Sequence, residues 1–268
     1  MKNTFTKLLS LAFLSLSTMT FAQTQKGIDI DGGGILDKSG ASVSMPDANT
    51  VAIGAFGDDG NGSDAGHVRI YNWNGTAWTQ KGSDIDGEAA GDYSGWSVCM
   101  PDANTVAIGA LNNDGNGNNS GHVRIYSWNG TAWTQKGSDI DGEAAGDLLG
   151  NSISMPDANT LAIGAYNNDG NGVNAGHVRI YSWNGTAWTQ KGSDIDGEAA
   201  FDFAGSTVCM PDANTVAIGA YGNDGNGNDA GHVRIYNWNG TTWAQKGNDI
   251  DGEATDDFSG SPVSMPDA

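Results

Sequence analysis

The chain has 268 residues, and its 12 Lys and Arg face 32 Asp and Glu, which gives a formal net charge of -20. This excess of acidic residues excludes a protein that binds nucleic-acid phosphates or an anionic membrane, because binding to either surface needs clustered cations. Nine Trp and seven Tyr also exclude a disordered linker, which is normally poor in aromatic residues.

The first 22 residues predict a secretory signal peptide. Lys2 and Lys7 give a basic start to a brief apolar stretch, and the small residues Thr20 and Ala22 precede the expected cleavage before Gln23. A buried amphipathic helix is the alternative interpretation. The apolar stretch is shorter than the roughly 20 residues that a spanning helix needs, and no other segment is as apolar. We therefore expect residues 23–268 to be secreted or displayed at the cell surface, without insertion into a membrane.

Internal repetition organises the rest of the sequence. Gln-Lys-Gly recurs with a period of 55 residues and no slippage, and one His and one Trp per unit keep the same period. The units span residues 25–79, 80–134, 135–189 and 190–244, followed by a partial unit at 245–268. The recurring residues are His67, His122, His177 and His232, and Trp78, Trp133, Trp188 and Trp243.

The second and third units are identical at 46 of 55 positions, which indicates recent duplication. Sameness between units therefore says little about which residues matter for function. The differences gather in residues 93–98 and 111–120, which marks both regions as tolerant of change.

Each unit carries the signals of four short strands. In the second unit we expect strands at 97–100, 105–110, 122–128 and 131–136, and no stretch of the mature chain shows helical periodicity. Four strands joined in order by hairpins and then repeated are typical of β-propeller blades. The predicted fold is therefore an all-β propeller of four-stranded antiparallel blades, with about four and a half blades present.

The last hairpin of a unit allows a finer prediction. Asn129 and Gly130 are the residue pair that two-residue type I′ turns prefer, which would place Trp128 opposite Thr131 and Tyr126 opposite Trp133. Strand alternation then puts the aromatic side chains on one face and aliphatic ones on the other. We expect both faces to be buried between blades, and a sugar-stacking platform is the alternative role of the aromatic face.

These residues resemble the FG-GAP type of repeat, which builds the propeller of integrin alpha chains and of many secreted bacterial propellers. The likeness rests on Gly-Asp-Tyr-Ser-Gly-Trp-Ser-Val at 91–98 and Asn-Thr-Val-Ala-Ile-Gly-Ala at 104–110, and it covers 25–268. The family's Phe-Gly is replaced by Ser94-Gly95, and its Gly-Ala-Pro becomes Gly-Ala-Leu at 109–111. The resemblance implies a propeller fold and an extracellular binding or adhesion role, but no shared reaction.

The family's calcium loop between the first two strands is not carried over. Residues 100–104 are too few to supply six or more oxygen ligands. Two other oxygen-rich stretches, 84–92 and 113–116, lack the Asp-x-Asp-x-Asp-Gly register and are interpreted as solvated acidic loops. We predict no metal-ligating residues, and calcium is the one cofactor left open.

No catalytic or cofactor-binding residues are predicted either. One His per unit gives no metal-ligand spacing, and a structural role at the start of a strand is expected. Near-identical units repeat one chemistry, whereas an active site needs different residues in different roles. Cys99 and Cys209 occupy a position that is Ser in the other units, so we expect a small buried residue rather than a disulfide.

These observations favour a non-catalytic binding or adhesion module with an extracellular protein or glycan ligand. The alternatives are a glycan-active propeller enzyme and an architectural spacer in a larger surface protein. Because residues 245–268 begin a hairpin without its returning strand, we also expect an incomplete ring that continues in the natural gene.

Overall fold

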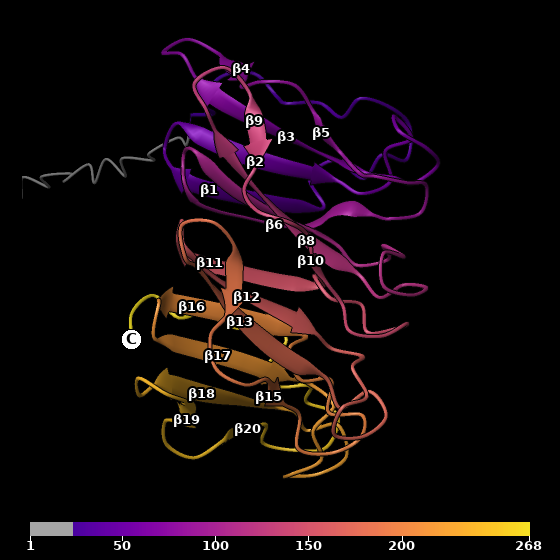
Figure 1. Ribbon diagram of the computed structural model, residues 1–268, viewed down its shortest axis with the longest axis vertical. Helices are drawn as coiled ribbons and strands as arrows, with labels where there is room; N and C mark the ends of the chain where they lie inside the picture. The colour runs from indigo at the N-terminus through magenta and orange to yellow at the C-terminus, as the bar shows by residue number, and fades with distance from the viewer. Residues whose placement is uncertain (1–23) are drawn as a thin grey trace, which may run out of the picture.

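The computed structural model describes residues 24–268, so the predicted signal peptide lies outside the described part of the chain. Residues 24–268 form strands and loops without a helix, and they hence contain no helix that could cross a membrane. The strands make four separate sheets, stacked in chain order along the long axis of the molecule (Figure 1). The predicted all-β fold of repeated antiparallel sheets is confirmed.

All four sheets have the same strand order, and the short fifth strand of each lies at the start of the next unit. The first strand pairs with the second, the second with the third, and the third with both the fourth and a two-residue fifth strand. The first sheet comprises β1 (Ser42–Asp47), β2 (Thr50–Ala55), β3 (His67–Trp73), β4 (Trp78–Gln80) and β5 (Ile85–Asp86). The second comprises β6 (Ser94–Asp102), β7 (Thr105–Ala110), β8 (His122–Trp128), β9 (Trp133–Gln135) and β10 (Ile140–Asp141).

The other two sheets repeat this plan. The third comprises β11 (Ser152–Asp157), β12 (Thr160–Ala165), β13 (His177–Trp183), β14 (Trp188–Gln190) and β15 (Ile195–Asp196). The fourth comprises β16 (Thr207–Asp212), β17 (Thr215–Ala220), β18 (His232–Trp238), β19 (Trp243–Gln245) and β20 (Ile250–Asp251). The sequence analysis did not predict the short fifth strand, because two residues are too few to show alternation.

The predicted register of the last hairpin is wrong by two residues. Trp128 pairs with Trp133, and Tyr126 with Gln135, so the loop spans residues 129–132 instead of two turn residues. The Asn129 side chain explains the longer loop, because its Oδ1 accepts hydrogen bonds from the backbone N–H groups of residues 131 and 132. A shift of two residues leaves each side chain on its face, so the predicted aromatic face is retained.

The first strands of all units lie side by side along a groove of about 310 Å³, lined by residues from all five units. Successive sheets approach one another closely here. A Cβ atom on Gly109 would lie 2.2 Å from the carbonyl oxygen of Gly150, so only glycine fits. Ser97 Oγ donates a hydrogen bond to the same oxygen at 2.7 Å.

The two cysteines are free and take part in a repeated contact between first strands. Cys99 Sγ accepts a hydrogen bond from the backbone N–H of Met155 at 3.3 Å, as Ser44 Oγ does from that of Met100 at 2.9 Å. Both side chains are small, partly buried acceptors, which is why Ser and Cys exchange at this position. The prediction of a small residue without a disulfide is confirmed.

Apolar side chains fill the space between successive sheets. Val68 and Ile70 of the first sheet and Val106 and Ile108 of the second form one buried cluster, against which Trp133 packs. Equivalent clusters join the second sheet to the third and the third to the fourth. Burial of these faces supplies most of the drive for stacking, because apolar burial contributes about 25 cal/mol per Å².

A clasp at the outer side of each junction joins two sheets, and it consists of Lys81, Gly82, Trp128 and Trp133 at the first junction. The Lys81 ammonium lies 5.1 Å from the centroids of both indole rings, and Trp133 Nε1 donates to the Lys81 carbonyl at 2.8 Å. The two indoles meet edge to face at 5.4 Å. The Trp side chains are therefore half-buried packing elements. From the sequence, both faces of the hairpin were predicted to be buried between blades.

The clasp predicts a matched pair of glycine variants. Gly82 has φ +81°, and an added Cβ would lie 2.8 Å from the Trp128 ring, whereas Gly247 has φ +83° and open space around it. Both Gly→Ala changes should cost about 1–2 kcal/mol for the left-handed backbone. Gly82→Ala should cost a further ~1–3 kcal/mol for the clash, measured by urea unfolding. Equal losses in the two variants would contradict tight packing of the clasp.

Candidate functional site

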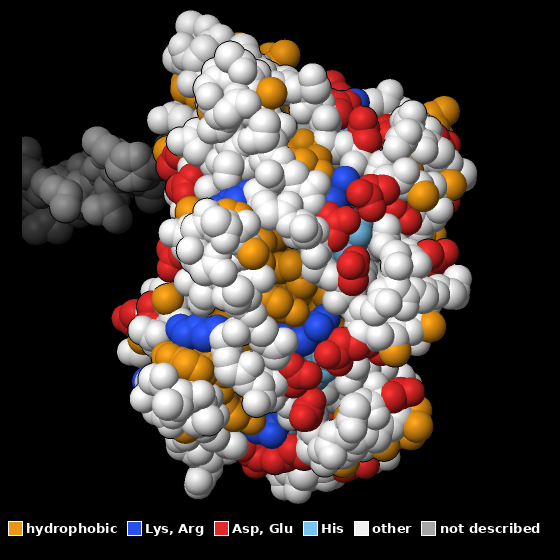
Figure 2. Space-filling model, viewed as in Figure 1, with side chains coloured by type: hydrophobic (Ala, Val, Ile, Leu, Met, Phe, Trp, Pro, Cys, Tyr) orange, Lys and Arg blue, Asp and Glu red, His pale blue; other side chains and the backbone are white. Residues whose placement is uncertain are grey.

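Three equivalent clefts lie beneath the clasps, one at each junction between sheets. The first has a volume of about 460 Å³ and is lined by residues 82–86 of the first sheet and by Tyr126 and residues 131–133 of the second. The other two measure about 440 and 340 Å³. These volumes are within the range of small-ligand sites in proteins. Figure 2 shows such grooves, where hydrophobic side chains adjoin Lys, Arg and carboxylates.

The walls of a cleft differ in chemistry. One wall carries Trp133 and Tyr126, and the other carries Asp84 and Asp86. Because the indole N–H of Trp133 is bonded to a backbone carbonyl, the indole offers only ring carbon to the cleft. The guanidinium carbon of Arg124 lies 5.7 Å from the centroid of the Tyr126 ring, which holds that ring in place.

Burial raises the pKa of several groups around the clefts. The pKa of Tyr126 is raised by burial, so its hydroxyl stays protonated and can donate a hydrogen bond. The pKa values of Asp141 and Asp196 are raised mainly by burial and further by the neighbouring Asp139 and Asp194. A cleft thus combines an apolar aromatic wall with a hydroxyl donor and carboxylate acceptors.

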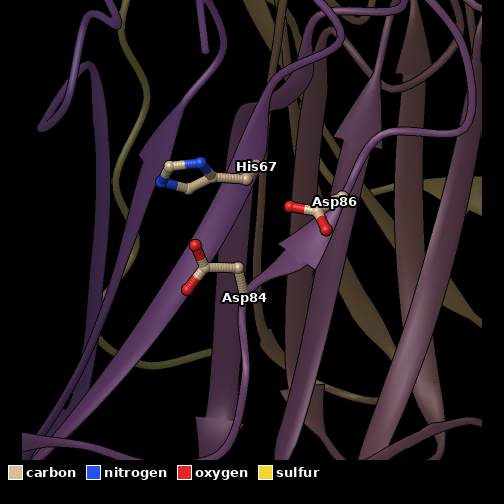
Figure 3. Close-up of side chains that lie close together, drawn as sticks. All are labelled: His67, Asp84 and Asp86. Carbon is tan, nitrogen blue, oxygen red and sulfur yellow. The ribbon is translucent and has the colours of Figure 1, made fainter. Parts of the chain in front are cut away.

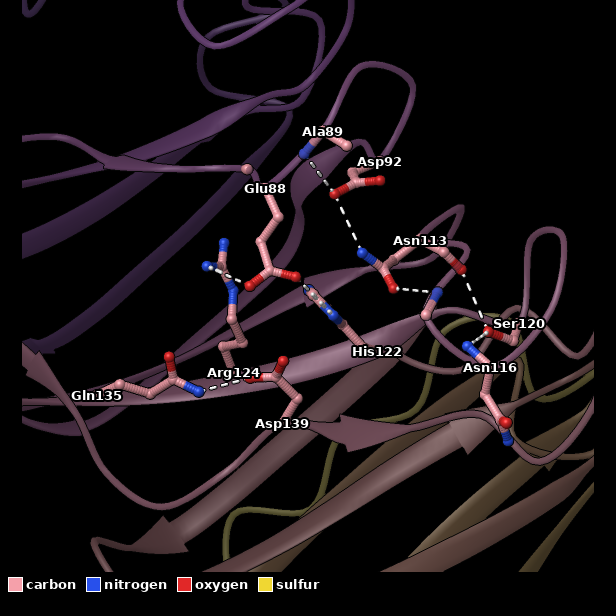
Figure 4. Close-up of polar contacts among 12 residues, drawn as sticks. Glu88, Ala89, Asp92, Asn113, Asn116, Ser120, His122, Arg124, Gln135 and Asp139 are labelled. Atoms are coloured by element: carbon pink, nitrogen blue, oxygen red, sulfur yellow. Dashed lines mark hydrogen bonds and ion pairs between the residues drawn. The ribbon is translucent and has the colours of Figure 1, made fainter.

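A polar cluster of Glu88, His122, Arg124 and Asp139 lies next to the clefts (Figure 4). Glu88 follows β5 of the first sheet, whereas His122 and Asp139 belong to the second, so the cluster joins two sheets. Arg124 Nη1 lies 3.5 Å from Glu88 Oε1, and its Nη2 donates to the backbone carbonyl of Asp86 at 2.7 Å. The Glu143–His177–Asp194 and Glu198–His232–Asp249 clusters repeat it at the next two junctions.

The imidazoles are the most deeply buried polar groups of these clusters. His122 starts β8, as the sequence predicted, and is only 1% exposed. Burial lowers its pKa to about 4, with the positive charge of Arg124 acting in the same direction and Asp139 opposing it. The pKa of His177 is likewise lowered to about 4 by burial. At neutral pH these side chains are therefore neutral.

The first unit departs from this plan, and its His67 lies close to Asp84 and Asp86 of the same sheet (Figure 3). Its position equivalent to Glu88 is Gly33, and Asp58 replaces the Asn113 of the second unit. Asp58 Oδ1 lies 3.0 Å from His67 Nδ1. Arg69, without a glutamate from a preceding sheet, pairs with Asp84 of its own sheet at 2.9 Å.

The acidic stretch at 84–92 is not one solvated loop, which corrects the sequence-based interpretation. Asp92 is only 3% exposed, accepts a hydrogen bond from the backbone N–H of Ala89 at 3.0 Å, and also accepts one from Asn113 Nδ2 at 3.1 Å. Asp84 and Asp86 instead line the cleft, and Glu88 extends to the next sheet. The sequence could not show this division, because Asn113, 21 residues after Asp92, and Arg124, 36 residues after Glu88, decide it.

Unit-specific residues gather at one side of the junctions. Phe56 lies 5.5 Å from Tyr93 and 4.9 Å from Trp96, and Phe203 stacks on Tyr221 at 5.0 Å, as ring centroid distances. Trp96 is 38% exposed and Phe201 is 54% exposed. The tolerant regions found in the sequence therefore form apolar contacts between neighbouring units and a few exposed aromatic positions.

Comparison with known proteins identifies the repeat. Residues 80–126 match the family model of the FG-GAP repeat, which confirms the resemblance seen in the sequence. The match falls within the second unit, and the other units share the sequence pattern of that unit. No curated protein matches the chain.

Solved structures share the fold at low identity. A candidate 6-phosphogluconolactonase from Bacteroides uniformis is similar with a TM-score of 0.53 and 9% identity, over 79% of this chain and 56% of that one. The β-propeller domain of the trilobed protease from Pyrococcus furiosus is similar with a TM-score of 0.44 and 10% identity, over 77% of this chain and 56% of that one. This chain spans just over half the length of those structures, and such identities bear on the fold alone.

The buried histidines predict a pH dependence of stability. The unfolded chain binds a proton near pH 6.5, whereas folded His122 does so near pH 4, so lowering the pH through this window favours unfolding. Each such histidine should remove about 1.4 kcal/mol of unfolding free energy per pH unit. Urea unfolding between pH 7.5 and 5 should show a shallower pH slope for His122→Asn than for the parent. Parallel slopes would contradict the depressed pKa.

Proposed function

We propose that this propeller-like FG-GAP repeat domain is a non-catalytic binding module, secreted or displayed at the cell surface, that binds glycans in its inter-sheet clefts. The observation that carries the proposal is the cleft wall pairing of Trp133 and Tyr126 with Asp84 and Asp86, repeated at three junctions. Sugars present apolar C–H faces and hydroxyl groups, which aromatic carbon and carboxylates complement.

Electrostatics narrows the class of glycan. The chain carries a formal net charge of -20, and each cleft has two aspartates in its lining. Carboxylated or sulfated glycans would be repelled, because like charges brought together in a partly desolvated cleft cost free energy. Neutral and amino-sugar glycans fit the clefts best.

Repetition of the cleft also bears on function. A repeating polysaccharide can engage several equivalent clefts on one rigid stack, so that weak individual contacts add to a high avidity. Near-identical units supply such copies directly. They do not supply the different residues in different roles that a single active site needs.

A glycan-active enzyme is the second candidate function. It is favoured by the raised pKa of Asp141, because a carboxyl group that holds its proton to higher pH suits the general acid of glycoside hydrolysis. The same binding experiment tests it, since chromatography of the bound oligosaccharide reveals any cleavage product.

The test is a screen of neutral, amino-sugar and acidic oligosaccharides with the mature protein and with Asp86→Asn/Asp141→Asn/Asp196→Asn. We expect binding of neutral or amino-sugar glycans, and at least a tenfold loss in the triple variant, because its clefts keep their shape while each changed aspartate loses its charge and one of its two acceptor oxygens. Asp251→Asn is the matched control, since among the described residues no Trp hairpin lies opposite this position.

A second control separates the clefts from the exposed aromatic residues. Trp96→Ala/Phe201→Ala should bind glycans like the parent, because neither residue lines an inter-sheet cleft. Failure to bind any glycan of the screen, or binding that the triple variant retains, would refute the proposed function.

A further inference from the structure

The buried imidazoles of three units lack hydrogen-bond partners. Neither ring nitrogen of His122 or His232 has one, and Nε2 of His177 has none either. Each of these side chains is only 1% exposed. A buried polar group in a folded protein normally has a partner, so three repeated exceptions call for an explanation beyond packing.

Each imidazole faces carboxylate oxygens at a distance too long for a hydrogen bond. His122 Nδ1 lies 3.8 Å from Glu88 Oε2, and His177 Nδ1 lies 3.8 Å from Asp194 Oδ2. Two ligands of a tetrahedral metal, each about 2.0–2.1 Å from the ion, stand roughly 3.4 Å apart. The donor atoms of one cluster all lie within 4.8 Å of one another, so a small contraction would place them around one ion.

Neighbouring side chains orient the two carboxylates. Arg124 lies against Glu88 Oε1 and leaves Oε2 directed at the imidazole, as Figure 4 shows. Gln135 Nε2 donates to Asp139 Oδ1 and leaves its other oxygen free. Ligating carboxylates in metal sites are commonly held by such hydrogen bonds from a second layer of residues.

The first unit supplies a contrast. His67 has the Asp58 carboxylate at 3.0 Å, and Asp84 Oδ2 accepts two hydrogen bonds from Arg69. Where the glutamate of a preceding sheet is absent, the protein thus provides the imidazole with a partner of its own. Where the glutamate is present, the imidazole stays without one.

We propose that the Glu88–His122–Asp139 cluster and its two copies bind a divalent metal ion of the zinc class, one at each junction between sheets. One imidazole nitrogen and two carboxylate oxygens suit Zn²⁺ and similar first-row ions, with water completing the coordination. Calcium prefers six to eight oxygens, which this donor set does not supply. The proposal departs from the sequence-based expectation of no metal ligands, because that expectation rested on the spacing of ligands along the chain and not on carboxylates that the fold brings to the histidine.

The test measures metal binding to the mature protein after treatment with a chelator. Isothermal titration with Zn²⁺ should give about three tight ions per chain, one for each Glu–His–Asp cluster and none at His67, because His67 and Asp84 already have partners. Co²⁺ should give visible absorption bands with the same stoichiometry. Glu88→Gln should reduce both to about two ions, because it removes one ligand at one junction.

Glu253→Gln is the matched control. Glu253 holds the position of Glu88 in the partial unit, and among the described residues no His lies 34 positions after it. The variant removes the same charge, so its stoichiometry should remain that of the parent. A stoichiometry that both variants lower equally would show nonspecific binding to an acidic surface and overturn the proposal.

Two further outcomes would also overturn it. One is the absence of tight Zn²⁺ binding in the parent, and the other is competition by Ca²⁺ at equal concentration. Glu88 is 45% exposed, so Glu88→Gln should fold like the parent, and the circular dichroism spectrum checks this.

Discussion

The contact between successive sheets near the central groove constrains everything else in this protein. It is made by a glycine of one second strand against the carbonyl of a glycine in the next unit, as in Gly109 and Gly150. The same approach recurs at Gly54 and Gly95, where a Cβ would again lie 2.2 Å from the carbonyl oxygen. These are the glycines of the two sequence stretches that resemble the FG-GAP repeat. The family pattern therefore reflects how closely one sheet can approach the next.

Once this approach is fixed, the outer parts of neighbouring sheets are brought together at a set distance. The clasp of Lys81 over two tryptophans, the cleft beneath it and the histidine cluster all combine residues from two sheets. A single sheet thus carries only part of each site. Sites arise at junctions, and near-identity of the units makes the junctions alike.

Local features of the structure could be predicted from the sequence. Strand positions follow from alternation and turn residues. The predicted faces of β8 and β9 were correct although the predicted register was wrong by two residues, because such a shift leaves each side chain on its face. The error itself came from Asn129, whose side chain stabilises a longer loop than the Asn-Gly pair suggests. The exchange of Ser and Cys at position 99 was also explicable, since both side chains accept the same bond.

The candidate sites could not be predicted, because they depend on contacts between sheets. Nothing in the sequence places Glu88 beside His122, or Asp86 across from Trp133, until the stacking of the sheets is known. The sequence did contain one indication of these contacts. The first unit has Gly33 and Asp58 where the second unit has Glu88 and Asn113, and two positions that change together indicate that both contact the same partner.

The joint change at Gly33 and Asp58 also shows how an acidic chain keeps the junctions between its sheets stable. His67 and Arg69 of the first unit, which lack a glutamate across the junction, each have a carboxylate of their own sheet. In the later units Arg124 takes its carboxylate from the preceding sheet and so joins two sheets, while the imidazole beside it remains without a partner. Buried or partly buried charges are tolerated when they are paired. Pairing with Arg124 therefore explains why a glutamate occupies this position. The buried histidine without a partner would be explained only by a third group bound between the two sheets.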